Sequence, residues 1–149
     1  MELKYQFYIE GAPEKVWEIF MSPVQSKKIF YGCYIRSTFE TGASLEYVGP
    51  GNDGEDTVHI YGEVLAFVPN HLFSYTEHPG PSYYSNHEEL QTRVTITLER
   101  VGNCTQLTLI NDQWSENHPS RDKADPAWWM LLSSIKTLVE TGRTLDLGW

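Results

Sequence analysis

The chain has 149 residues, of which 40% are hydrophobic and 13% aromatic, so we expect a single domain over residues 1–149 with a sizeable core. Its formal net charge of −9 argues against nucleic acid or an anionic membrane surface as a partner, because both need a basic protein face. The first residues, MELKYQFY, contain no apolar signal segment, and no apolar run reaches the length of a bilayer span, so we expect a cytoplasmic protein.

In chain order, the first part of the sequence predicts a strand, two short helices and a second strand. Residues 4–9 alternate between apolar and polar side chains, as a half-buried strand does. Pro13 suits the first position of a helix, and Ser22 with Pro23 repeats this start signal. Residues 30–39 are rich in aromatic and β-branched side chains, which favours a strand.

The middle of the chain predicts further strands separated by turn signals. We expect them over residues 43–48, 57–68, 72–77, 89–101 and 105–111. The G-x-G-x-x-G pattern at residues 49–54 precedes a strand rather than the helix that a dinucleotide site needs, so we interpret it as a hairpin loop. Gly62 falls inside a long strand, where it either leaves room for a cavity or marks a bend.

The end of the chain predicts one long amphipathic helix over residues 126–142. Its apolar stripe consists of Trp128, Leu131, Leu132, Ile135, Leu138 and Val139. Asp125 is the expected N-cap, Pro126 the first helical residue and Gly142 the stop. We expect residues 112–125 to form a polar connection.

This order of elements predicts an α+β fold with a curved antiparallel sheet. The long helix must lay its apolar stripe on the sheet. A pocket forms between the two layers wherever the facing side chains do not fill the space.

Five segments carry a resemblance to a known family. They are IEGAPEKVWEIF at residues 9–20, GEVL at residues 62–65 followed by Pro69, FSYT at residues 73–76, residues 107–114, and WMLLSSIKTLVETG at residues 129–142. In this order the chain resembles the family named for the activator of Hsp90 ATPase, within the START/Bet v 1-like (SRPBCC) superfamily. The resemblance implies a helix-grip fold, in which a curved antiparallel sheet with two short helices wraps around a long C-terminal helix. In that superfamily the enclosed cavity commonly holds lipids, polyketides or other hydrophobic molecules. The superfamily shares no catalytic motif, so no catalytic residue is carried over.

The start of the last helix departs from the family pattern. The family often has Gly-Trp there, whereas this chain has Ala127, Trp128 and Trp129. We expect Trp129 to take the family's aromatic position and Trp128 to add bulk that narrows the cavity.

Aromatic side chains on the strands and at the helix start are the candidates for a binding site, with core packing as the alternative interpretation. The predicted ligand-binding residues are Tyr61, Phe73, Tyr75, Trp114, Trp129 and Leu132. The long segment 78–87 (HPGPSYYSNH) contains Tyr83 and Tyr84, which either cover the cavity mouth or pack as an ordinary surface loop.

The sequence predicts no metal site and no cofactor. The five histidines show no ligand spacing and none lies near a cysteine, although His78 and His87 flank one loop and could meet in space. No catalytic triad can be named, and there is no G-x-S-x-G motif.

We therefore expect a protein that binds a small hydrophobic or aromatic molecule, rather than an enzyme, with a protein partner or a homodimer also open. Two alternatives remain: a chaperone cofactor that acts through its surface, and a small enzyme that uses the cavity. An exposed apolar patch beside a closed cavity would favour the cofactor. An acid or histidine of perturbed pKa in an open cavity would favour the enzyme, and a mostly apolar open cavity would favour binding alone.

Overall fold

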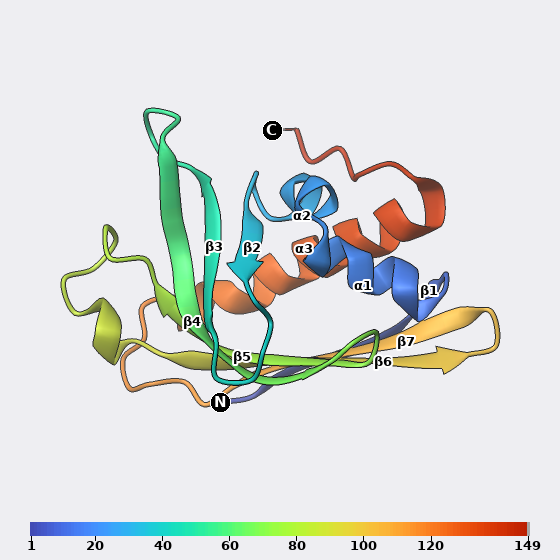
Figure 1. Cartoon of the computed structure of the whole chain (residues 1–149), viewed down its shortest axis with the longest axis horizontal. Coiled ribbons are helices and arrows are strands. Elements are labelled where there is room, and N and C mark those ends of the chain that lie inside the picture. The colour runs from blue at the N-terminus through green and yellow to red at the C-terminus, as the bar shows by residue number, and fades with distance from the viewer. Residues whose placement is uncertain (149) are drawn as a thin grey trace.

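The protein has the predicted α+β architecture, built on one curved antiparallel sheet. The computed structural model describes residues 1–148 (Figure 1). Its elements are β1 (Leu3–Glu10), α1 (Pro13–Met21), α2 (Pro23–Ile29), β2 (Tyr34–Ser37), β3 (Ser44–Pro50), β4 (Asp56–Val68), β5 (Leu72–Pro79), the short 3₁₀ helix η1 (His87–Glu89), β6 (Thr92–Val101), β7 (Cys104–Asp112) and α3 (Arg121–Thr141). The strands lie in the order β1-β7-β6-β5-β4-β3-β2, and all neighbours are antiparallel. This is a helix-grip fold.

The strand β4 bends the sheet. Its pairing with β3 shifts between Tyr47 and Val48, and its pairing with β5 shifts between Val64 and Ala66. Figure 1 shows β3 and β4 rising away from β5, β6 and β7, with α3 lying over the concave side. A Cβ atom at Gly62 would lie only 1.7 Å from the carbonyl oxygen of Thr76. Gly62 therefore marks the close approach of two strands at the bend, and it leaves no room for a cavity.

The long helix α3 buries the predicted stripe. Leu132, Ile135 and Val139 are buried against the sheet and α1, whereas Leu131 is half-buried. Gly142 has the left-handed φ of 77°, and its N–H donates to the Leu138 carbonyl at 2.9 Å. The predicted stripe and stop are confirmed.

The predicted start of this helix is wrong. The helix begins at Arg121, so Pro126 lies inside it and residues 121–125 are not a loop. Asp125 is not the N-cap: its carboxylate accepts a hydrogen bond of 2.7 Å from the Tyr5 hydroxyl. Pro126 is the sixth residue of the helix and has no backbone N–H, so the helix lacks one of its regular hydrogen bonds there.

The two short helices start at their predicted signals. Pro13 begins α1, and the Ser22 hydroxyl accepts from the Gln25 N–H at 3.5 Å at the start of α2. The buried Ser26 hydroxyl lies 2.6 Å from the Ile19 carbonyl oxygen. This contact ties α2 to α1.

Two predicted strands are shorter than expected. The segment 30–39 forms a strand only over Tyr34–Ser37, because Tyr31 and Gly32 have φ values of 53° and 81° that reverse the chain after α2. The segment 89–101 becomes a strand only at Thr92, after η1. By contrast, the glycine-rich segment is confirmed as a hairpin loop, in which the Gly51 N–H donates to the Glu55 carbonyl at 2.7 Å.

Within residues 1–148, none of the helices combines the length and the apolar character that a membrane crossing requires.

Candidate functional site

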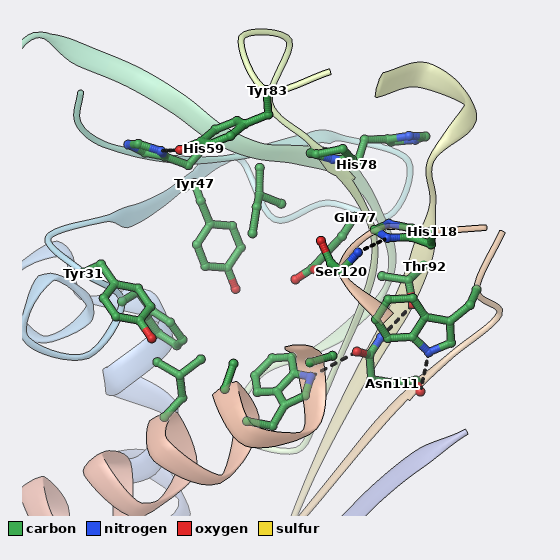
Figure 2. Close-up of a pocket in the computed structure, with 18 of the residues that line it drawn as sticks. Tyr31, Tyr47, His59, Glu77, His78, Tyr83, Thr92, Asn111, His118 and Ser120 are labelled. Carbon is green, nitrogen blue, oxygen red and sulfur yellow. Dashed lines mark hydrogen bonds between the residues drawn. The ribbon is translucent and has the colours of Figure 1, made fainter. Parts of the chain in front are cut away.

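A pocket of about 340 Å³ lies between the start of α3, the raised part of the sheet and the segment after β5 (Figure 2). Its apolar walls come from side chains that are far apart in the sequence. Seven of these are aromatic: Phe30, Tyr31, Tyr47, Tyr83, Tyr84, Trp114 and Trp128. Ile60, Ala124, Ala127 and Leu131 complete the apolar lining. This is the concave, mainly apolar kind of place that small ligands occupy.

The carboxyl group of Glu77 reaches into this apolar space. Figure 2 shows Glu77 from β5 and Tyr47 from β3 pointing their polar ends into the same volume. Burial raises the pKa of Glu77 from its ordinary value of 4.5 to about 7, and the nearby Tyr75 hydroxyl acts in the opposite direction. At neutral pH this carboxyl group is close to half ionised.

Glu77 has no positive counterpart in its surroundings. Among the described residues, no lysine or arginine lines the pocket and none forms an ion pair with Glu77. A carboxylate in an apolar site without a partner is costly. The pocket therefore carries one acid that the protein itself does not neutralise.

Two tyrosine hydroxyls form a fixed pair beside the acid. The hydroxyl groups of Tyr47 and Tyr75 lie 2.6 Å apart. Burial, above all, raises the pKa of both phenols, so both stay neutral across the physiological range. The neutral Tyr47 hydroxyl gives the pocket a directional polar contact.

A hydrogen-bonded network holds the wall opposite Tyr47. The Trp128 indole N–H donates to the Asn111 side-chain oxygen at 3.0 Å. The Asn111 amide nitrogen in turn donates to the Thr92 hydroxyl at 2.7 Å and to the Arg93 carbonyl at 2.9 Å. Asn111 thus connects α3 to β6 and β7 and fixes the orientation of the Trp128 ring.

The segment 78–87, for which both a cover over the cavity and an ordinary surface loop were expected as alternatives, lies at the pocket. Tyr83 is 53% exposed and Tyr84 38% exposed, and both line the pocket. The Tyr83 hydroxyl is hydrogen-bonded to His59 Nδ1 (Figure 2). His59 Nε2 lies 3.0 Å from the Pro50 carbonyl oxygen, which can only accept, so Nε2 carries the proton and Nδ1 accepts from Tyr83.

His118 supplies a neutral imidazole to the lining. It is buried, and its Nδ1 accepts from the Ser120 N–H at 3.2 Å. Its ring stands edge-on to Trp114 with 5.1 Å between centroids. Burial lowers the pKa of His118, and the nearby Arg121 and His78 act in the same direction. This histidine therefore stays uncharged at neutral pH.

The predicted site residues lie in several different places. Trp114 lines the pocket. Phe73, Tyr75 and Leu132 are fully or almost fully buried in the core, where Tyr75 reaches the pocket only through its contact with Tyr47.

The remaining two predicted residues, Tyr61 and Trp129, lie neither in the pocket lining nor among the fully buried core residues. Tyr61 stacks on His78 with 4.8 Å between ring centroids, and its hydroxyl is hydrogen-bonded to His87. Trp129 is 53% exposed and packs edge-on against Tyr5. Trp128 takes the wall position instead, because it belongs to the apolar stripe of α3 that faces inward.

Sequence reasoning missed Glu77, although a signal for it was present. Residues 73, 75 and 77 of a strand share one face, so the buried pair Phe73 and Tyr75 predicts that Glu77 points inward as well.

No metal centre accompanies this pocket in the part of the chain that is described. Residues 1–148 contain no group of three or more side chains of the metal-binding types. His78 and His87 do meet, but through a hydrogen bond of 3.3 Å from His78 Nδ1 to the His87 carbonyl oxygen.

Comparisons with known proteins agree with the architecture. Residues 10–140 match the family described as "Activator of Hsp90 ATPase homolog 1-like protein". No curated protein matches the chain.

Solved structures of other proteins share the fold. The Aha1 dimer from Colwellia psychrerythraea has a TM-score of 0.71 at 18% identity, over 96% of this chain and 98% of that one. An HSP90 activator from Plasmodium falciparum has a TM-score of 0.66 at 15% identity, over 86% and 87%. A putative protein in the dynemicin biosynthetic locus has a TM-score of 0.69 at 17% identity, over 96% of this chain and 48% of that one. At such identities the likeness shows the fold alone.

Proposed function

The chain belongs to the family of activator of Hsp90 ATPase homolog 1-like proteins, and within that family we propose that it is a cytoplasmic protein that holds a small, mainly aromatic or hydrophobic molecule. The observation that carries this proposal is the pocket of about 340 Å³ with seven aromatic side chains in its lining. The two free cysteines, Cys33 and Cys104, suit the reducing conditions of the proposed compartment.

The proposed mechanism is enclosure. Apolar surface of the ligand leaves water against rings such as Phe30 and Trp128, which contributes about 25 cal/mol per Å² before the costs of association. The Trp128 ring is already fixed by Asn111, so little side-chain freedom is lost when a ligand packs on it. Tyr83 and Tyr84 are exposed and line the pocket, so their movement would admit and cover the ligand.

Binding of a neutral fluorescent aromatic molecule tests the proposal. We expect saturable uptake at one site with quenching of tryptophan emission, and little dependence on salt because the contacts are apolar. Native mass spectrometry of the protein purified from its own host then identifies a ligand that remains bound.

Filling the pocket gives the matched comparison. Ala127→Leu places a larger side chain in the lining, whereas Ser133→Leu adds the same side chain to an exposed position of α3. We expect only the first variant to lose probe binding while both remain folded. Equal uptake by both variants, or no uptake by the unaltered protein, would contradict the proposal.

A second candidate function is proton-transfer catalysis by Glu77. It is favoured by the acid in the pocket, whose pKa of about 7 suits a group that both accepts and donates protons at neutral pH. Under this candidate, Glu77→Gln abolishes turnover of a bound substrate and leaves its binding intact.

A third candidate, a chaperone cofactor that binds another protein, is supported by the family description and by the likeness to an HSP90 activator. A homodimer is supported in the same way by the Aha1 dimer. Hsp90 ATPase rates with and without the chain, and sedimentation of the chain alone, test these two ideas.

A further inference from the structure

The charge of the pocket is unbalanced. Glu77 is the one acidic side chain in the lining, and within residues 1–148 neither a lysine nor an arginine accompanies it there. The titratable side chains that share the lining are the histidines His59, His78 and His118, and the phenols of Tyr31, Tyr47, Tyr83 and Tyr84. A negative group in an apolar site calls for a positive partner, and here the ligand can provide it.

The aromatic walls of the pocket also favour a positively charged ligand. Aromatic faces carry negative potential and attract organic cations, most strongly where water is excluded. Phe30 and Tyr47 stand edge to face with 5.6 Å between their ring centroids, and Trp128 is held in place by its indole hydrogen bond. The space in front of Glu77 is therefore bounded by rings that are already fixed.

We infer that the pocket binds an organic amine in its protonated form, with the ammonium group beside Glu77 and the apolar body against the aromatic walls. The inference rests on the proposed binding function and names the ligand class of that same pocket. The opposite arrangement, in which a protonated Glu77 donates to a carbonyl or carboxylate ligand, uses neither the negative charge of the acid nor the negative faces of the rings.

The two arrangements differ in their dependence on pH. Burial holds the pKa of Glu77 at about 7 in the empty pocket, so a bound cation, which needs the ionised carboxylate, displaces a proton. The affinity for a cation then rises about tenfold between pH 6 and pH 8, and the affinity for a carbonyl or carboxylate ligand falls. The phenols of Tyr47 and Tyr75 stay neutral throughout, because their pKa values are raised.

Three probes with one common body test the inference by calorimetry on the full chain. They are naphthylmethylamine, naphthylmethanol and naphthoate, which are cationic, neutral and anionic between pH 6 and pH 8. We expect the amine to bind about tenfold or more tightly than the alcohol at pH 8, and naphthoate to bind most weakly. Proton release, measured in buffers of different ionisation enthalpy, should accompany binding of the amine alone.

The variant Glu77→Gln assigns the effect to this carboxyl group. It should remove the preference for the amine and retain binding of the alcohol, whereas the control Glu63→Gln changes the same charge at an exposed position of β4 and should leave both unaltered. A pH slope that remains in the Gln variant belongs to groups other than Glu77. If that variant fails to fold, proton release in the unaltered protein still decides the matter.

The outcomes separate the two proposals. The inference of a cation is overturned by equal binding of amine and alcohol, by tighter binding of naphthoate, or by a pH slope that persists in full in Glu77→Gln. In each of these cases the proposed binding of apolar molecules in the pocket still holds. Failure of all three probes to bind overturns both.

Discussion

The indole nitrogen of Trp128 donates to the side-chain oxygen of Asn111 at 3.0 Å, and this contact joins the first turns of α3 to strands β6 and β7. Both side chains are buried. The wall of the pocket is therefore held by a polar contact inside an otherwise apolar environment, where each unpaired group is costly.

Removing this contact should weaken both the fold and the pocket. We expect Asn111→Ala to lower the free energy of unfolding by about 1–3 kcal/mol, because the Trp128 N–H loses its buried acceptor. Chemical denaturation measures the loss. The exposed Asn86→Ala is the control, since the Asn86 side chain makes no capping hydrogen bond. A loss that is equal in the two variants would show that the network does not stabilise the fold.

The apolar stripe of α3 predicts a second result. Leu132 and Ile135 are buried, so truncation of either to alanine should cost about 2–5 kcal/mol of stability. The exposed Ser133→Ala, on the opposite side of the same helix, should change stability by less than about 0.5 kcal/mol. Denaturant melts of the variants check both values, and a small loss at Leu132 would mean that α3 does not pack as described.

Gly62 predicts a third result, at the bend of the sheet. Even alanine there would place a Cβ against the Thr76 carbonyl, so Gly62→Ala should destabilise the protein by about 1–3 kcal/mol or more. Binding measured on the fraction that remains folded should be intact. Its exposed neighbour Glu63→Ala should melt close to the unaltered protein. A fully stable Gly62→Ala that no longer takes up the probe would instead place this residue in the wall of the pocket.

Glu77 gives stability a predictable dependence on pH. Its pKa is raised from 4.5 to about 7 by burial, so between these values the folded protein keeps a proton that the unfolded chain has released. The contribution of this group to folding is present at low pH and is lost as the pH rises from about 4.5 to 7. The free energy of unfolding of Glu77→Gln, measured relative to that of the unaltered protein, should therefore rise by about 2–3 kcal/mol between pH 4.5 and pH 7.

Denaturation of the unaltered protein and of Glu77→Gln, run in parallel at each pH, measures this difference in stability. Other titratable groups contribute equally to both proteins, so their contributions cancel. His118, whose pKa is lowered by burial, acts in the opposite direction in both proteins. A difference that does not change with pH would show that Glu77 has its ordinary pKa.

The fold was predictable because its signals are local and repeated. Alternation in segments such as 72–77 and the three-and-four spacing along α3 each arise from one periodic contact with the core. The start of α3 was not predictable in the same way. Residues 121–125 are mostly polar, and their helical state depends on tertiary contacts such as the hydrogen bond from Tyr5 to Asp125.

The site was less predictable, because a pocket is the space left between side chains that come from distant segments of the chain. Phe73 and Tyr75 were expected in its wall and lie buried in the core, whereas Glu77, two residues further along the same face, reaches the open space. At the helix start, the family pattern pointed to Trp129, while the periodic stripe already placed Trp128 inward. Neighbouring residues such as Trp128 and Trp129 point about 100° apart around a helix, so a shift of one position decides which ring faces a ligand.

The bend at β4 also has a consequence for how the sequence of such a protein can evolve. It separates strands β5 to β7 with β1 from the raised part of the sheet, which supplies Tyr47, His59 and Ile60 to the pocket. Substitutions at exposed lining residues such as Tyr83 would alter the shape and charge offered to a small molecule, whereas Tyr47 belongs to the same buried core as Leu132 and is less free to change. One scaffold can in this way acquire new ligand preferences while its folding stability stays under separate selection.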